Sequence, residues 1–248
     1  MIILSVLFFV TAILYSSVGF GGGSTYLALL LIWDIPYYIF PMIALICNII
    51  VVSSNSLNYI RVGNYNLKLL IPFLIGSIPF AFIGGTLLIE KKTFEILLFF
   101  VLTISGVLLL INNKSYDDDK ITVDKLNNFL SFLIGAILGL ISGIVGIGGG
   151  IFLSPILFLL KAEKPKVIAT TASLFILVNS ISGIIGHLTK ETVINEVVNY
   201  WFLFLFVLLG GLVGNYINLN IFSSRMLAII TSLLVIFVAI RMSFRLFL

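Results

Sequence analysis

Most of this chain consists of apolar stretches long enough to cross a lipid bilayer. Of its 248 residues, 60% are hydrophobic and only 10% are charged, and the mean hydropathy is +1.25. Soluble domains average about 25% charged residues, whereas the hydrocarbon core of a bilayer is about 30 Å thick and takes about 20 apolar residues per helix. The sequence therefore predicts an all-α fold, a polytopic bundle of transmembrane helices with no soluble domain.

The apolar stretches divide into eight predicted spans and two shorter pieces. The first stretch lacks a basic leading segment and a small-residue cleavage site, so we expect it to remain as a span and not to be removed as a signal peptide. The shorter pieces, 25–33 and 151–160, hold nine and ten residues, about 14 and 15 Å of helix, and neither crosses alone. The eight spans are predicted at 2–18, 37–60, 69–89, 93–112, 128–145, 167–187, 199–219 and 225–246.

Each short piece follows a run of glycines and precedes a proline. The segments are "VGFGGGSTYL" at 18–27 and "VGIGGGIFLS" at 145–154. Their glycines stand 127 positions apart, and Pro36 and Pro165, which follow the short pieces, stand 129 apart. This spacing indicates a duplication, either parallel or inverted according to the number of crossings per half. The predicted organisation is a first transmembrane repeat at 1–112, a polar linker at 113–127 and a second repeat at 128–248.

The glycine runs predict two breaks in transmembrane helices. Unwound backbone in hydrocarbon leaves N–H and C=O groups unpaired, at a cost of several kcal/mol each, so two breaks need a reason. We expect half-helices to begin at about Ser24 and about Ile151 and to present free N–H groups and positive dipole ends to the breaks. Helix N-termini of this kind bind anions. Paired interruptions in two halves are the best sequence indication of a transporter's substrate site near the midplane.

Close helix packing is the alternative explanation of these glycines. It fits less well, because packing glycines are spaced by about one helical turn, whereas three consecutive glycines destabilise a helix by about 1 kcal/mol each relative to alanine. A dinucleotide fingerprint or a phosphate loop does not fit, because neither run follows a strand and the Walker lysine is missing.

The helix after each break is rich in uncharged polar residues, which suits a wet path or hydrogen bonds between helices. No charged residue lies at the centre of a predicted span, so we expect helix dipoles to supply the positive potential. Glu95 and His187 are candidates for proton coupling, and an interfacial position is the simpler interpretation of both. The predicted substrate-binding residues are Gly21, Gly22, Gly23, Ser24, Asn48, Asn55, Gly148, Gly149, Gly150, Ser173 and Asn179, with Cys47, Thr25 and Thr171 as further candidates.

Composition disfavours several other classes of protein. One cysteine, Cys47, forms no internal disulfide, and one histidine leaves no His/Cys cluster for a metal, so we expect neither a metal nor a cofactor. Cys47 is also explained as an ordinary buried core residue. The net charge of +4 is scattered through loops, which is typical of membrane-flanking charge and not of a nucleic-acid-binding surface. No nucleophile–base pair or carboxylate dyad indicates an enzyme.

Two segments of the second half carry a family resemblance. "GIVGIGGGIFLSPIL" (143–157) and "ATTASLFILVNSISGIIGHL" (169–188) resemble the sulfite exporter TauE/SafE family of membrane permeases, and the similarity spans the whole chain. The resemblance implies transport of a small sulfur-containing anion, such as sulfite, a sulfonate or thiosulfate, across the prokaryotic cytoplasmic membrane. The first half departs from the pattern, because Ala28 replaces the counterpart of Pro155 and Tyr59 that of His187. We therefore expect two functionally unequal halves.

These observations favour a multi-pass secondary transporter of the cell membrane that binds its anion at the two breaks. Rocking of one half against the other would alternate access to that site. A passive anion channel with the same glycine lining is one alternative function. A membrane-embedded accessory or enzyme subunit is another.

Overall fold

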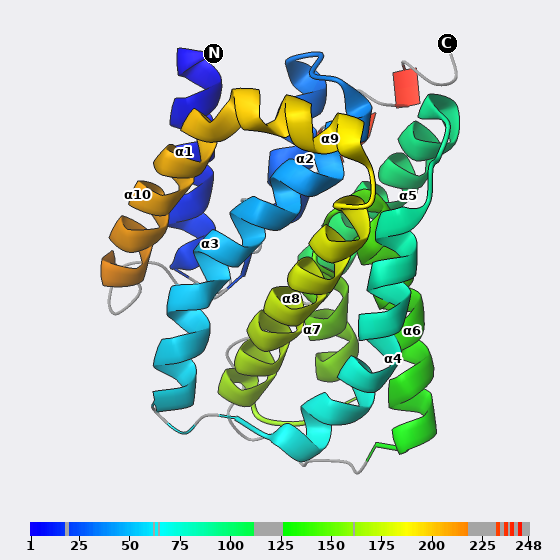
Figure 1. Cartoon of the computed structure of the whole chain (residues 1–248). Helices are drawn as coiled ribbons and strands as arrows, with labels where there is room; N and C mark the ends of the chain where they lie inside the picture. Colours follow the sequence, from blue (N-terminus) through cyan, green and yellow to red (C-terminus); the bar gives the residue numbers. More distant parts are fainter. Residues whose placement is uncertain are drawn as a thin grey trace.

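The computed structural model is helical throughout the part of the chain that it describes, without a strand in those residues (Figure 1). The predicted linker lies almost wholly outside the described residues, as do Gly19 and most of the last predicted span. The described residues are 1–17, 20–61, 63, 65–111, 126–160, 162–217, 232–233, 236–237, 239–240 and 243–244.

The helices fall into two series on either side of residues 112–125. The first series is α1 (Ile2–Ser16), α2 (Gly23–Ile32), the 3-10 turn η1 (Tyr37–Ile39), α3 (Phe40–Arg61), α4 (Leu67–Thr86) and α5 (Lys91–Ile111). The second series is α6 (Asn128–Val145), α7 (Gly150–Leu159), α8 (Pro165–His187), α9 (Glu191–Val197), the 3-10 turn η3 (Val198–Tyr200) and α10 (Trp201–Ile217).

Five helical segments of the described chain are long and apolar enough to cross a membrane, and they coincide with five of the eight predicted spans. Helix α5, with 21 residues, matches the span predicted at 93–112, whereas α1 has 15 residues and is shorter than a full crossing. The count of eight spans stays a prediction. The five segments are Tyr37–Leu57, Leu67–Thr86, Asn128–Val145, Lys166–His187 and Glu191–Tyr216.

The prediction of two short helices is confirmed. Helices α2 and α7 have ten residues each and begin one residue before the predicted positions. Their N-caps are Gly22, with φ of 86°, and Gly149, with φ of 78°. These left-handed conformations cost glycine little but other residues about 1–2 kcal/mol. These two glycines therefore set the start of α2 and α7.

Helices from the two series interleave. Helix α1 packs against α10, α4 against α6, and α3 against α8, so every major pairing joins the first series to the second. In Figure 1, α1 begins at the top and α6 at the bottom, while α3 and α8 run obliquely through the middle of the molecule. The short helices lie inside this arrangement, and residues 23–31 of α2 are all buried.

The closest pairings are backbone to backbone. A Cβ added to Gly139 of α6 would lie 2.7 Å from Cα of Ser77 in α4, and one added to Gly214 of α10 would lie 2.9 Å from Cα of Ile13 in α1. Small residues allow such approach between membrane helices. Close helix packing therefore explains Gly139 and Gly214, which lie within helices and not at the breaks.

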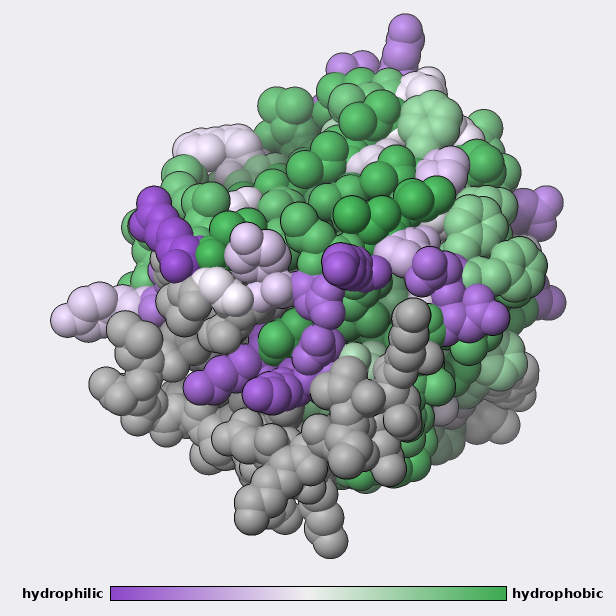
Figure 2. Space-filling model, turned by 90° about the horizontal axis from the view of Figure 1, so that it is seen from below, coloured by the Kyte–Doolittle hydropathy of each residue, from purple (hydrophilic) through white to green (hydrophobic). Residues whose placement is uncertain are grey.

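The outer surface suits a lipid environment with polar ends. Large apolar side chains such as Ile75 of α4, Ile137 of α6 and Leu209 of α10 are exposed on the flanks. Figure 2, a view from below, shows hydrophilic residues gathered at this end of the molecule beside broad hydrophobic areas. Cations near membrane boundaries are typical of spanning proteins. Among the described residues, the exposed cations at this end are Arg61 at the end of α3, Lys68 in the first turn of α4, Lys164 just before α8 and Lys166 in the first turn of α8.

Candidate functional site

The two glycine breaks lie against each other in the interior, with Asn48 of α3 between them. A Cβ added to Gly23 would lie 2.8 Å from the carbonyl oxygen of Ile147 and 2.9 Å from Nδ2 of Asn48. A Cβ added to Gly148 would lie 2.9 Å from the same nitrogen. Two segments about 127 positions apart in the sequence therefore meet around one amide side chain.

The two short helices begin with the same hydrogen bonds. The N–H groups of Thr25 and Tyr26 donate to the carbonyl of Gly22, at 3.0 and 3.1 Å. In α7 the N–H groups of Phe152 and Leu153 donate to the carbonyl of Gly149, both at 3.1 Å.

This common pattern leaves the first N–H groups of each helix without an acceptor inside the helix. They belong to Gly23 and Ser24 in α2 and to Gly150 and Ile151 in α7. Each N-terminus carries a partial charge of roughly +0.5.

Buried polar side-chain atoms near the breaks have no hydrogen-bond partner among the described residues. Ser24 Oγ and Asn48 Oδ1 are two of them, and Ser180 Oγ, which lies 3.2 Å from the position of an added Cβ on Gly148, is a third. All three residues are at most 1% exposed. Leaving such an atom unpaired costs about 1–3 kcal/mol. The hydroxyls of Ser24 and Ser180 are therefore available to donate to an anion.

A small cavity lies at the meeting point of the breaks. Its volume is about 10 Å³, which is room for one water molecule but not for an anion with three or four oxygens. The structure therefore shows this cavity closed to such an anion. The lining residues are Tyr15, Phe20, Gly21, Gly22, Gly23, Ser24, Ile147, Ile151 and Ile176.

The two breaks differ in the side chain that faces them. Gly21 and Gly23 face the amide of Asn48, whereas Gly148 faces both this amide and Ile176 of α8, and Gly150 faces Ile176. Asn48 and Ile176 stand 128 positions apart, within the spacing of the duplicated glycines and prolines. We did not predict Ile176 or Ser180 as site residues. The repeat offset was the signal that would have found Ile176.

Several predicted site residues hold helices together beside the breaks. Asn55 Nδ2 donates to the carbonyl of Ser16 at 2.9 Å, where α1 ends before the first break. Ser173 Oγ lies 3.0 Å from Ser56 Oγ and joins α8 to α3. These residues fix the helices around the breaks without lining the small cavity.

Other predicted residues are bonded locally or buried in the core. Thr25 Oγ1 lies 2.7 Å from the hydroxyl of Tyr15, while Thr171 Oγ1 and Asn179 Nδ2 donate to the carbonyls of Val167 and Phe175 in their own helix, at 2.8 and 2.9 Å. Cys47 is fully buried in the hydrophobic core. The residues lining the small cavity do not include Thr25, Thr171, Asn179 or Cys47.

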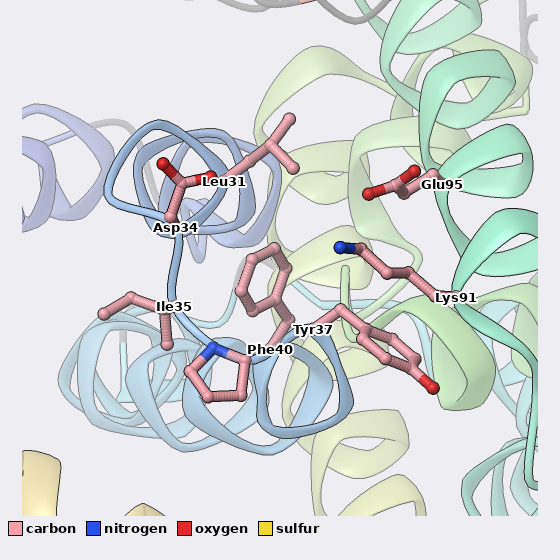
Figure 3. Close-up of a pocket in the computed structure, with 8 residues that line it drawn as sticks. Leu31, Asp34, Ile35, Tyr37, Phe40, Lys91 and Glu95 are labelled. Atoms are coloured by element: carbon pink, nitrogen blue, oxygen red, sulfur yellow. The ribbon is translucent and has the colours of Figure 1, made fainter. Parts of the chain in front are cut away.

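Glu95 lies at the far end of α2 from the breaks. It lines a cavity of about 190 Å³ together with Lys91 and Asp34. Figure 3 shows the side chains of Lys91 and Glu95 turned from α5 toward the end of α2. Because ten residues of helix extend about 15 Å, this carboxylate lies well away from the breaks. The position agrees with the interfacial interpretation of Glu95.

No group of three or more His, Cys, Asp or Glu side chains that would suit a metal ion occurs in the described part of the chain.

The comparisons with known proteins point to transport. The family model for the sulfite exporter TauE/SafE matches residues 4–242. No solved structure matches the chain.

Three curated relatives are named probable membrane transporter proteins. The chain is 27% identical to one from Sinorhizobium fredii over 232 residues, which cover 93% of each protein. It is 33% identical to one from Methanocaldococcus jannaschii over 195 residues, covering 74% of this chain and 71% of the relative. It is 24% identical to one from Bacillus subtilis, covering 88% of each.

Proposed function

Because the chain belongs to the sulfite exporter TauE/SafE family of membrane transporters, we propose that it carries a small sulfur-containing anion, such as sulfite, a sulfonate or thiosulfate, by secondary transport. The protein is a multi-pass membrane transporter and not an enzyme. Beyond membership of the family, we propose the class of substrate, the position of the binding site and the transport mechanism.

The observation that supports this site is the meeting of two helix N-termini around Asn48. The N–H groups of residues 23–24 and 150–151, which have no acceptor within their own helix, form a group of donors in an apolar interior together with the hydroxyls of Ser24 and Ser180. Where water is excluded, fixed donors attract a negative charge more strongly than they do in water. No lysine or arginine lines the small cavity, so backbone and hydroxyl donors bind the anion.

Transport requires the two breaks to separate, because the closed site has room for one water only. We take the interleaved pairs α1–α10 and α4–α6 as rigid units, because their backbones are in direct contact. Helices α1 and α6, which precede the two breaks, begin at opposite ends of the molecule in Figure 1, and this supports an inverted repeat, in which one unit rocks against the other. Separation of Phe20 from Ile147 and Ile151 would open the cavity on one side at a time, which is alternating access.

The test replaces the two N-cap glycines with alanine. Gly22→Ala and Gly149→Ala each place a Cβ on left-handed backbone, and the new atoms would lie 3.1 Å from the ring of Tyr15 and 2.8 Å from that of Phe175. We expect each variant to reduce uptake of radiolabelled sulfite or thiosulfate by proteoliposomes at least about tenfold. This factor corresponds to a loss of about 1.4 kcal/mol of free energy from the distorted site.

Gly211→Ala in α10 is the matched control, because its Cβ would meet only Cα of Val51, at 3.9 Å. This control should transport normally. Normal transport by both N-cap variants would contradict the site. Saturable counterflow would distinguish a transporter from a passive channel, which shows none.

A further inference from the structure

His187 joins the end of α8 to the end of α6, close to the second break. Its Nε2 lies 2.9 Å from the carbonyl oxygen of Gly143. Since a carbonyl only accepts, Nε2 carries the proton in this arrangement. Helix α6 ends at Val145, and Gly146 follows with φ of 90°, so the Gly143 carbonyl is among those that lack a partner within the helix. His187 therefore caps the helix that leads into the second break.

The other ring nitrogen of His187 faces a lysine. Lys190 Nζ lies 3.4 Å from Nδ1 of His187 and donates to the carbonyl of Leu87, at 2.7 Å, where α4 ends. Nδ1 is then an acceptor with one lone pair, which is the position where a proton would bind. Desolvation lowers the pKa of the Lys190 ammonium.

A larger cavity connects this pair with the surface. Its volume is about 560 Å³, and Leu88 on its wall is 86% exposed. His187 itself is 2% exposed and packed in the contact between α4 and α8, where a Cβ added to Gly85 would lie 3.1 Å from its backbone nitrogen. The titratable groups that line the cavity are Tyr37 and Tyr38 of η1, Glu90 before α5, His187 at the end of α8, Lys190 before α9 and Glu196 of α9.

We propose that His187 is the proton-coupling site of the transporter. A proton from water in the 560 Å³ cavity binds Nδ1, the Lys190 ammonium turns away from that nitrogen, and the imidazolium keeps its bond from Nε2 to the Gly143 carbonyl. The added positive charge lies at the C-terminal end of α6, where the helix dipole stabilises it. The inference rests on the proposed function, because the substrate is taken to be an anion bound at the breaks.

Proton and anion binding are then coupled through α6. Only two residues separate Gly143 from Gly146, where α6 gives way to the second break. A positive charge at this place increases the affinity of the break for an anion, and by linkage a bound anion increases the proton affinity of His187 by the same factor. One proton would accompany each anion, and an inward proton gradient would drive anion uptake.

The chain contains a single histidine, which makes the test direct. The protein is labelled with [15N]histidine and purified without a polyhistidine tag, so that the imidazole signals in NMR come from His187 alone. They are titrated without and with thiosulfate or methanesulfonate, whichever stabilises the protein more in a thermal-shift screen. Both are anions of strong acids, so their own charge does not change during the titration.

We expect one titration step of the imidazole, with a midpoint that rises by about one unit when the anion binds, which corresponds to tenfold tighter binding to the protonated form. A bound anion with an unmoved midpoint would overturn the coupling alone. If none of sulfite, thiosulfate and methanesulfonate binds at any pH of the titration, the proposed function fails together with the coupling.

Variants separate coupling from a structural role. His187→Gln keeps an amide donor for the Gly143 carbonyl but cannot bind a proton, so anion affinity should become independent of pH while binding persists. Lys190→Met removes the charge beside Nδ1 and should raise the His187 midpoint. Lys166→Met, at an exposed position in the first turn of α8, is the matched charge control and should leave the midpoint unchanged. Wild-type pH dependence in His187→Gln would overturn the proposal.

Discussion

Asn48 is the side chain on which both breaks converge. Its Nδ2 lies 3.4 Å from the carbonyl of Gly146, while its Oδ1 has no partner among the described residues. A neutral amide at this position leaves the neighbouring helix N-termini free to attract an external anion. If the anion binds at the breaks as proposed, the neutrality of this side chain matters more than its size.

Asn48→Asp changes that charge with almost no change in shape. We expect the new carboxylate to satisfy the N–H groups of the breaks itself and to repel the substrate, so that affinity for thiosulfate or sulfite falls more than about tenfold, the effect of a lost charge-assisted interaction of about 1.5–3 kcal/mol. Thermal-shift titration of the purified protein measures the affinity. Asn195→Asp, the same substitution at an exposed position of α9, is the control, and equal losses in both variants would contradict a role for Asn48 in binding.

The polar residues of α3 and α8 were only partly predictable from the sequence. Asn48 lies at the breaks as expected, but Asn55 and Ser173 join helices, because polar groups in an apolar interior must find partners whether or not a substrate passes. Ile176 was not predicted, because an apolar residue in an apolar helix gives no local indication that it lies at a binding site. The repeat offset from Asn48 indicates this position, and the contact with Gly148 and Gly150 places it beside the second break.

At the scale of the helices, the spacing of glycines distinguishes breaks from packing contacts. Consecutive glycines at 21–23 and 148–150 lie where the short helices α2 and α7 begin. Gly135, Gly139 and Gly143 recur every four residues, remain helical and face the backbone of α4. The breaks and the lengths of α2 and α7 were predictable for this reason, because both follow from local backbone preference.

Gly139→Ala tests the packing role independently of transport. Its Cβ would lie 2.7 Å from Cα of Ser77, so α4 and α6 must move apart. We expect a loss of about 1–3 kcal/mol of stability, typical of overpacking, seen as a lower unfolding temperature in detergent. The preference among sulfite, thiosulfate and methanesulfonate should not change. Gly211→Ala is again the control, and a Gly139→Ala protein as stable as the wild type would contradict the close packing.

At the scale of the whole molecule, the interleaving of the two series was not predictable. Hydropathy locates apolar stretches but does not show which helices pack together. The contacts of α1 with α10 and of α4 with α6 depend on the path of the whole chain through the bundle. The interleaving matters for function because it brings together two breaks that are far apart in the sequence. The linker and most of the last predicted span lie outside the described residues, so those two predictions stay untested.

The most direct measurement is an experimental structure with selenite, the selenium analogue of sulfite, located by anomalous scattering. We expect one selenium peak between the two breaks, with the anion's oxygens about 3 Å from amide nitrogens of residues 21–24 and 148–151, and with the breaks further apart than in the closed form. A selenium peak elsewhere, such as beside Lys190, or breaks wound into continuous helix would contradict it.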